Sequence, residues 1–216
     1  MTPVRCLYAI ADASFGNPIE LAPRLFEGGA RRIQVRNKNA TARELLDQVE
    51  RILALAPPDA QVIVNDRVDI ALIAGAAGVH LGQTDLPPAA AREILGPERI
   101  IGVSTHNLDQ ALAADKLPVD YVAVGPIFAT LTKENPDPVL GLKELATICK
   151  AMHKPVVAIG GIRLDNVEDV LDAGATSVAV IRGLLDSADI AARVRTWVEF
   201  MERLGTTASN DRPSSE

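Results

Sequence analysis

The sequence has few aromatic residues and no excess of positive charge. Aromatic side chains make up 3% of its 216 residues, which argues against binding of single-stranded nucleic acid by base stacking. Lys and Arg total 22 and Asp and Glu total 28, for a net charge of −6, whereas nucleic acid backbones attract clustered cations. We therefore expect no nucleic acid partner, and any basic site must be small and local.

Long apolar runs and cysteine motifs are also missing. No run of about 18 apolar residues occurs, so no membrane span is expected, and the N-terminus MTPVRCLYAIAD lacks an apolar run of signal-peptide length. Cys6 and Cys149 lie in separate segments, outside any CxxC or Cys/His ligand spacing. We interpret them as buried, reduced thiols, which favours a cytoplasmic over a secreted setting.

Short apolar runs alternate with longer amphipathic segments along the chain. The runs are rich in Val and Ile, as expected for parallel strands covered on both faces, and lie at 6–11, 32–35, 61–64, 78–81, 100–104, 121–124, 155–159 and 177–180. The segments between them predict helices at 18–28, 41–55, 68–74, 87–95, 107–116, 142–152, 166–173 and roughly 186–204. Thr41, three residues before Glu44, has the spacing of a capping box.

Strand-then-helix units repeated in this way predict an α/β fold with a parallel sheet. Their number is that of a (β/α)₈ TIM barrel, which we expect as a single domain over residues 1–205. A doubly wound open sheet is the alternative. Residues 206–216 are polar and turn-rich, and we expect them to form a disordered tail.

Polar residues follow the second apolar run, at the end of the barrel where active sites form. Gln34, Arg36 and Lys38 alternate there, and a spacing of two points all three to the same side. Two cations and an amide suit an anionic ligand. A solvated strand end with surface cations is the alternative interpretation.

Carboxylates follow the third and fourth runs. Asp66, next to Asn65, and Asp85 end neighbouring predicted strands, so they can converge on one hard cation. Mg²⁺ typically uses one or two carboxylates and completes its shell with water and substrate phosphate. Either residue alone is more often a helix cap, but the pair beside a basic strand end favours a metal site.

The later strand ends offer groups that suit phosphate. The long segment between Gly125 and Gly141 contains Thr130, Thr132 and Lys133, and we predict a lid over residues 126–140, with a flexible connector as the alternative. Gly160-Gly161 and Ile181-Arg182-Gly183 end the last two runs, the usual phosphate position in such barrels. Tight turns without a ligand are the alternative there. His80 and His106 complete the rim without an assigned proton-transfer role.

The strand ends resemble those of the thiamine-phosphate synthase family. The matching segments, in chain order, are QVRNKN (34–39), VNDRVDIAL (64–72), GVHLGQTDLP (78–87), IGVSTHN (101–107), VGPIF (124–128), TLTK (130–133) and AIGGI (158–162). The resemblance implies a TIM-barrel transferase that uses Mg²⁺ to condense 4-amino-2-methyl-5-(diphosphooxymethyl)pyrimidine with a thiazole phosphate. Its products are thiamine monophosphate and diphosphate, and a homo-oligomer is possible.

The resemblance also implies roles for individual residues. The pyrimidine diphosphate would be held by Gln34, Val35, Arg36, Asn37, Lys38, Asn65, Ser104 and Lys133, with Arg36, Lys38 and Lys133 as the catalytic cations. The thiazole phosphate would be held by Thr130, Leu131, Thr132, Gly161, Ile181 and Arg182, and Mg²⁺ by Asp66 and Asp85. The family usually has Glu in place of Asn37, and many members have Ser in place of Arg182.

Two other functions fit parts of this pattern. A thiazole tautomerase of the related barrel family would carry His after the glycine of strand six and would lack the strand-four Asp, whereas this chain has Pro126 and Asp85. A non-catalytic barrel that binds a phosphate ligand would not need the full set of Asp66, Asp85 and the three cations. Both are weaker interpretations than the synthase.

Overall fold

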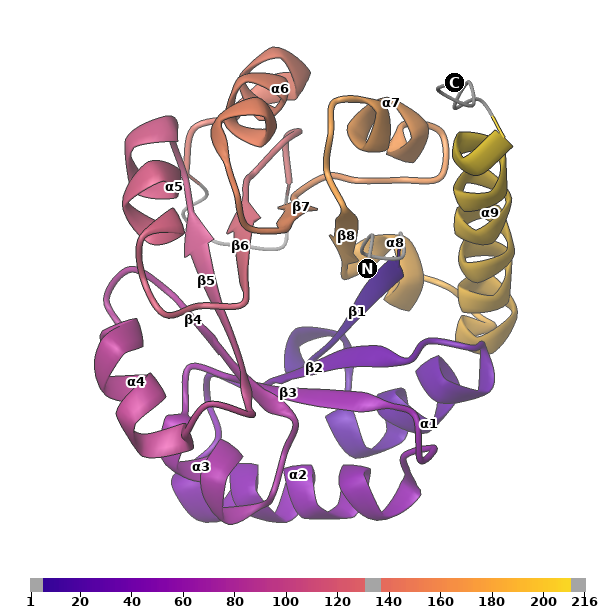
Figure 1. The fold of residues 1–216 in the computed structure, drawn as a ribbon. Coiled ribbons are helices and arrows are strands. Elements are labelled where there is room, and N and C mark those ends of the chain that lie inside the picture. The colour runs from indigo at the N-terminus through magenta and orange to yellow at the C-terminus, as the bar shows by residue number, and fades with distance from the viewer. Residues whose placement is uncertain (1–5, 131–136, 211–216) are drawn as a thin grey trace.

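The computed structural model describes residues 6–130 and 137–210, with residues 205–210 as backbone only. In this part of the chain, eight parallel strands form a closed barrel in sequence order, with β1 also paired to β8 (Figure 1). The strands are β1 (Cys6–Asp12), β2 (Arg32–Arg36), β3 (Gln61–Asn65), β4 (Gly78–Leu81), β5 (Ile100–Thr105), β6 (Tyr121–Val124), β7 (Val156–Ile159) and β8 (Ser177–Val180). The predicted (β/α)₈ barrel is confirmed.

Helices surround the barrel and follow each strand in turn (Figure 1). They are α1 (Pro18–Glu27), α2 (Ala42–Leu55), α3 (Val68–Ile73), α4 (Pro88–Leu95), α5 (Leu108–Asp115), α6 (Gly141–Ala151), α7 (Val167–Asp172), α8 (Arg182–Leu185) and α9 (Ile190–Asn210), with a 3₁₀ turn, η1, at Ala13–Phe15. The predicted capping box opens α2, where the Thr41 and Glu44 side chains each accept from the other's backbone N–H.

The last predicted helix, at roughly 186–204, corresponds to α9 but begins later than expected, at Ile190. The short helix α8, which ends at Leu185, was not predicted. α9 continues to Asn210, into the segment for which a disordered tail was expected from residue 206. Residues 211–216 lie outside the described residues.

Alternate strand residues build two separate layers of core. Outward-facing residues such as Ile33 and Val64 pack beneath the helices, whereas Ile10, Ile63 and Tyr121 fill the barrel interior. Gly102 on β5 makes room for the Tyr121 ring, because a Cβ there would lie 2.0 Å from Tyr121 Cζ. The interior is therefore filled with side chains and is not a pore.

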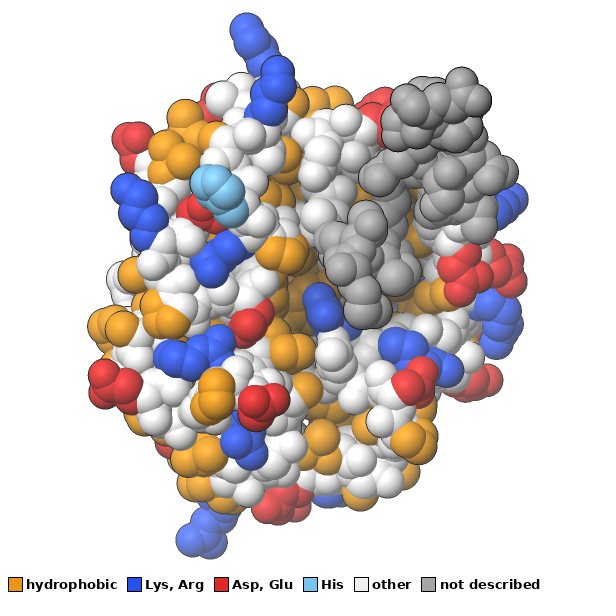
Figure 2. Space-filling model, viewed as in Figure 1, with side chains coloured by type: hydrophobic (Ala, Val, Ile, Leu, Met, Phe, Trp, Pro, Cys, Tyr) orange, Lys and Arg blue, Asp and Glu red, His pale blue; other side chains and the backbone are white. Residues whose placement is uncertain are grey.

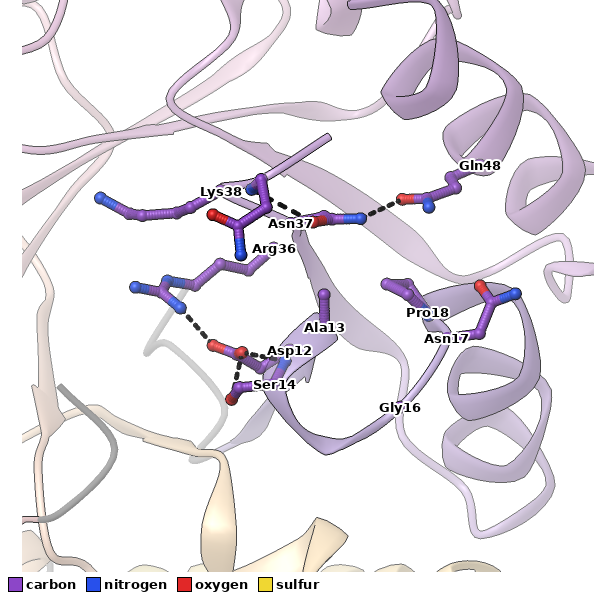
Figure 3. Close-up of a pocket in the computed structure, with 11 residues that line it drawn as sticks. Asp12, Ala13, Ser14, Gly16, Asn17, Pro18, Arg36, Asn37, Lys38 and Gln48 are labelled. Carbon is purple, nitrogen blue, oxygen red and sulfur yellow. Dashed lines mark hydrogen bonds and ion pairs between the residues drawn. The ribbon is translucent and has the colours of Figure 1, made fainter. Parts of the chain in front are cut away.

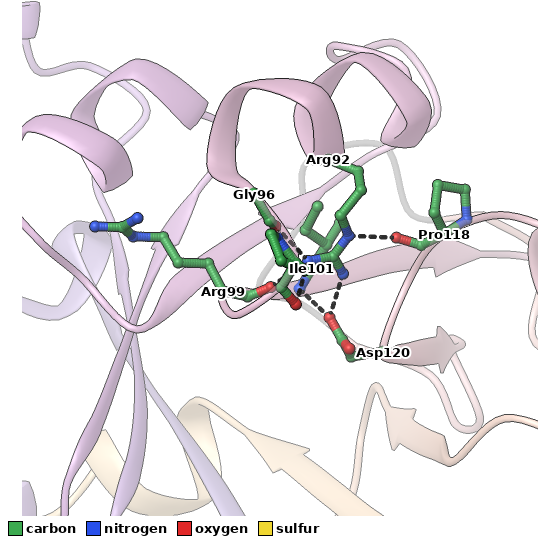
Figure 4. A network of polar contacts seen from close by, with 7 residues as sticks. Arg92, Gly96, Arg99, Ile101, Pro118 and Asp120 are labelled. Atoms are coloured by element: carbon green, nitrogen blue, oxygen red, sulfur yellow. Dashed lines mark hydrogen bonds and ion pairs between the residues drawn. The ribbon is translucent and has the colours of Figure 1, made fainter.

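Arg92 of α4 holds together the loops at the other end of the barrel, where the strands begin (Figure 4). Its guanidinium donates to the carbonyls of Gly96 and Arg99 at 2.9 and 2.6 Å and to the Asp120 carboxylate at 2.7 Å. Asp120 in turn accepts from the backbone N–H of Ile101 at 2.7 Å. One side chain thus fixes the backbone at the start of β5 and of β6.

The surface charges are mixed in sign (Figure 2) and the cysteines are free thiols, as the sequence predicts. On the face shown in Figure 2, Lys and Arg side chains are interspersed with Asp and Glu and form no broad basic patch. Cys6 and Cys149 are both free and half-buried, and burial raises the pKa of the Cys149 thiol to about 11. Among the described helices, none combines the length and apolar character that a bilayer crossing requires.

Candidate functional site

Arg36 at the end of β2 is fixed by a buried carboxylate at the end of β1. Its Nη1 donates to Asp12 Oδ2 at 2.5 Å, and Asp12 is only 1% exposed. The other Asp12 oxygen accepts from the backbone N–H and the hydroxyl of Ser14 at 2.9 and 2.7 Å. Because a guanidinium carries five N–H donors, one bond to Asp12 leaves others for a ligand.

A cavity of about 340 Å³ lies beside this pair, between the loops that follow β1 and β2. It is lined by Asp12, Ala13, Ser14, Gly16, Asn17, Pro18, Arg36, Asn37, Lys38, Asn39 and Gln48. Arg36 and Lys38 extend toward the same side, as their spacing predicts (Figure 3). Charged and polar groups dominate this part of the rim.

Two residues of this segment turn away from the cations. Asn37 points toward α2, where its amide donates to Gln48 Oε1 at 3.3 Å (Figure 3). Val35 is fully buried in the core between the strands and the helices. The side chains of both residues therefore serve the fold, and only their backbone could reach a ligand at the mouth.

Lys38 approaches the carboxylate that follows β3. Its Nζ lies 3.5 Å from Asp66 Oδ2. Asp66 has a φ of 63°, a backbone conformation that non-glycine residues seldom adopt and that often marks functional sites. Its backbone N–H donates to the His80 carbonyl at 2.8 Å, which ties it to β4.

Asp66 and Asp85 form a pair of carboxylates. Burial raises the pKa of Asp66, the neighbouring Asp85 carboxyl raises it further, and Lys38 opposes both effects. Asp85 Oδ2 accepts from the Gly82 backbone N–H at 2.6 Å. Two close carboxylates that repel each other are stabilised by a divalent cation.

The alternative, that these carboxylates are helix caps, does not fit the structure. The N-cap of α3 is Arg67 and that of α4 is Pro87, and neither helix start has a side-chain capping bond. In the described part of the chain, no group of three or more His, Cys, Asp and Glu residues is placed to hold a metal. Asp66 and Asp85 thus fit Mg²⁺, which takes few protein ligands and fills its shell with water and phosphate.

Gln34 and Ser104 lie at the two ends of a polar network inside the barrel. Gln34 is almost fully buried, and its amide nitrogen lies 3.0 Å from Tyr8 Oη. Ser104 Oγ lies 2.8 Å from His80 Nε2. Burial raises the pKa of Tyr8 to about 12, mainly by desolvation, and lowers that of His80 to about 4, so both side chains are neutral at pH 7. Asn65, at the end of β3, is half-buried and is the register partner of His80 on β4.

The strand ends on the opposite side of the barrel are tightly packed. The N–H groups of Ile127 and Phe128 donate to the carbonyls of Ile159 and Gly160, both at 3.0 Å. Gly161 has a φ of 64°, and a Cβ there would lie 2.6 Å from the Ala129 carbonyl oxygen. Packing alone thus requires this glycine.

The predicted lid over 126–140 is anchored at both ends. Leu140 and Gly141 donate to the carbonyls of Pro126 and Ile127 at 2.9 and 3.1 Å. Thr130 ends the described part of this loop, whereas Leu131, Thr132 and Lys133 lie outside the described residues. The lid prediction can therefore apply only between the two anchors.

Arg182 opens α8 and lies against the loop that follows β1. Its guanidinium carbon is 5.1 Å from the centre of the Phe15 ring, and its Nη1 is 3.3 Å from Asp186 Oδ2. The Ile181 carbonyl accepts from Leu184 and Leu185 within α8. Arg182 is about half exposed, so it remains accessible to an anion.

Sequence reasoning missed Asp12, Tyr8 and Tyr121. Asp12 ends the first apolar run, so the rule that selected the other strand ends could have found it. The two tyrosines sit within apolar runs and look like ordinary core residues, and nothing in the sequence places them next to His80.

A second cavity, of about 540 Å³, opens at the other end of the barrel. Its lining includes Arg32, Gln61, Asp120 and Ser177, which lie at or before the starts of strands. Because parallel barrels carry their chemistry at the ends of the strands, we assign the site to the opposite mouth.

Comparison with known proteins identifies the family. Residues 7–184 match the sequence model described as thiamine monophosphate synthase. The thiamine-phosphate synthase of Koribacter versatilis is 49% identical over 186 residues, covering 83% of this chain and 88% of the relative. That of Anaeromyxobacter dehalogenans is 48% identical over 196 residues, covering 89% and 87%.

A solved structure agrees with these relatives. The thiamine phosphate pyrophosphorylase from Pyrococcus furiosus superposes with a TM-score of 0.85 at 37% identity, over 94% of this chain and 98% of that one. Its likeness extends over nearly the whole barrel. The chain described here belongs to the thiamine monophosphate synthase family.

Proposed function

We propose that this chain, a thiamine-phosphate synthase by family, joins its two substrates by dissociative displacement at the mouth of the barrel. The bond between the pyrimidine methylene carbon and the diphosphate oxygen breaks first, and its electron pair leaves with the diphosphate. The thiazole nitrogen then donates its lone pair to that carbon. The electron-rich aminopyrimidine stabilises the cation between the two steps, so the reaction needs no strong general base.

The observation that carries this proposal is the Lys38–Asp66 pair at 3.5 Å. It places a cation beside the Asp66 carboxylate, whose pKa is raised by burial and by the neighbouring Asp85. A metal-bound diphosphate carries both signs of charge and so complements such a pair. Asp66 and Asp85 would hold Mg²⁺, which supplies positive charge against the negative charge that develops on the leaving group.

The remaining residues would hold and align the reactants. Arg36, oriented by Asp12, and Lys38 neutralise the diphosphate, and fixed cations of this kind are worth most where charge develops in the transition state. The resemblance adds Lys133 to the diphosphate contacts. It assigns Thr130, Leu131, Thr132, Gly161, Ile181 and Arg182 to the thiazole phosphate, where Arg182 would supply a cation in a place at which many members have Ser.

An assay with both substrates, with and without Mg²⁺, tests the proposal. The synthase forms thiamine monophosphate and diphosphate, and excess chelator abolishes the reaction. A tautomerase would isomerise the thiazole without metal, and a binding barrel would turn over neither substrate. Asp59→Asn is a matched control for the Asp66 and Asp85 variants, because Asp59 forms an exposed surface pair with Arg31.

The substrates define the partners of this chain as small phosphorylated molecules. We place the protein in the cytoplasm, because its two cysteines are free thiols. A secreted form isolated under oxidising conditions with modified cysteines would contradict that location.

A further inference from the structure

Five side chains from five strands form one continuous hydrogen-bonded chain across the barrel interior. Gln34 Nε2 lies 3.0 Å from Tyr8 Oη, Tyr8 Oη 3.0 Å from Tyr121 Oη, and Tyr121 Oη 2.8 Å from His80 Nδ1. His80 Nε2 then lies 2.8 Å from Ser104 Oγ. The two ends of this chain, Gln34 and Ser104, are among the residues that the family resemblance assigns to the pyrimidine diphosphate.

Packing fixes the middle of the chain. The His80 and Tyr121 rings are stacked at 5.6 Å with an angle of 19°, and the Tyr8 ring meets Tyr121 edge-on at 5.9 Å. His80, Tyr8 and Tyr121 are all buried. These rings cannot turn away to find other partners, so each hydrogen bond depends on the next one.

Proton counting leaves two ways to satisfy every bond. A hydroxyl has one proton, and a neutral imidazole has one donor and one acceptor nitrogen. In one direction the Gln34 amide donates to Tyr8, each tyrosine donates onward, and His80 Nε2–H donates to Ser104. In the other, Ser104 donates to His80, and the reversed chain ends with Tyr8 donating to the Gln34 carbonyl.

The ligand at Ser104 decides between the two directions. A diphosphate only accepts hydrogen bonds, so the single Ser104 proton must go to it. Ser104 Oγ must then accept from His80 Nε2–H, which sets the direction of every bond back to Gln34. One of the two Gln34 amide N–H groups is used by Tyr8. This bond turns the amide nitrogen toward Tyr8, so the carbonyl oxygen is the group that meets the ligand.

We propose that His80 and Tyr121 are positioning residues that couple the diphosphate end of the substrate to its pyrimidine end. An anion at Ser104 makes Gln34 present an acceptor, which matches the 4-amino group of the pyrimidine and opposes a carbonyl at the same position. This inference rests on the proposed function and adds to it the basis for choosing an amine over an oxo group. A buried polar contact of this kind discriminates strongly, because the wrong substrate leaves polar groups unpaired.

Tyr121→Phe is the sharpest test, since it keeps the ring and removes only the hydroxyl that joins Tyr8 to His80. The values of kcat/KM are compared for the 4-amino pyrimidine diphosphate and its 4-oxo analogue. Once the chain is cut, the Gln34 amide can turn, and we expect the preference for the amine to fall by roughly tenfold, the net value of about one hydrogen bond. Ser177→Ala, which removes a buried hydroxyl at the other end of the barrel, is the control and should keep the preference.

A fall in kcat/KM that is equal for both substrates would show that Tyr121 is only structural and would overturn the inference. If the wild-type protein turned over neither substrate, that result would instead contradict the proposed function. A second measurement needs no variant: ¹⁵N NMR of the protein with Mg²⁺ and inorganic diphosphate reports which His80 nitrogen carries the proton. We expect Nε2, and a proton on Nδ1 would overturn the inference.

Discussion

Lys38, two residues after β2, lies 3.5 Å from Asp66, which directly follows β3, and the neighbouring cation Arg36 reaches back to Asp12 at the end of β1. The two cations at this end of β2 therefore meet carboxylates at the ends of two different neighbouring strands. This alternation of charge explains how a chain of net charge −6 keeps cations at its mouth without ligand. It is also the arrangement that the proposed ligand, a diphosphate with its own divalent cation, would complement.

The metal prediction concerns Asp85. Asp85→Asn should lower turnover by roughly 100-fold, the loss that follows from removing one major electrostatic contact, and should raise the Mg²⁺ concentration needed for half-maximal rate. Steady-state kinetics across a Mg²⁺ titration would measure both effects. Wild-type turnover in excess chelator would contradict a metal at this site.

Asp12 offers a second prediction, because its carboxylate holds the Arg36 guanidinium. Asp12→Asn keeps the shape and the Ser14 contacts but removes the charge that orients the guanidinium. We expect kcat/KM to fall by about tenfold, as for loss of one charge-assisted hydrogen bond, with the protein still folded. Asp59→Asn removes a surface partner from Arg31 and should leave the kinetics unchanged. A normal rate in Asp12→Asn would show that Arg36 needs no such support.

Much of the fold could be predicted from the sequence, because each strand is buried on both faces and reads as an apolar run. The short helix α8 could not, since a helix as short as Arg182–Leu185 shows no periodicity. The period of two placed Arg36 and Lys38 correctly, and the same rule sends Val35 to the opposite side. The chain through Tyr8, Tyr121 and His80 needed the barrel itself, because its members lie 41 to 113 residues apart.

The buried His80 predicts a pH dependence of stability. Its pKa falls to about 4 in the folded protein because burial disfavours the charged ring, whereas the unfolded chain binds the proton near pH 6.5. The stabilising contribution is therefore present above pH 6.5 and is lost as the pH falls toward 4, by on the order of 3 kcal/mol in total.

Urea unfolding at several pH values tests this contribution. His80→Gln should lose less free energy of unfolding between pH 7 and pH 5 than the wild type. His153→Gln alters an exposed histidine paired with Asp115 and serves as the control. Equal pH dependence in the wild type and His80→Gln would contradict a buried neutral His80.

Substitution of Arg92, at the end of the barrel away from the site, should lower stability without affecting catalysis. Arg92→Met removes the guanidinium that joins the Gly96, Arg99 and Asp120 groups, whose acceptors are part-buried or exposed. We expect a loss of about 1 to 2 kcal/mol in the free energy of unfolding, measured by urea denaturation, with kcat unchanged below the unfolding transition. A lower kcat in fully folded Arg92→Met would show that the far end of the barrel also governs the site.

The last prediction concerns how the cations act on the leaving group. Negative charge builds on the diphosphate as the carbon–oxygen bond breaks, so Lys38 and Lys133 should contribute more in the transition state than in the bound substrate. Lys38→Ala and Lys133→Ala should therefore lower kcat by more than they raise KM. Lys143→Ala, a change on α6, is a control for loss of a lysine charge elsewhere.

Initial rates at varied pyrimidine diphosphate concentration separate the two constants. A higher KM with unchanged kcat would mean that a lysine binds substrate and transition state equally well, and no change in either constant would mean that it is merely a solvated surface cation. The position of Lys38 argues against its being merely a solvated surface cation. It lies 3.5 Å from Asp66, so its removal also leaves the Asp66–Asp85 pair less neutralised, and the Mg²⁺ requirement should change together with kcat.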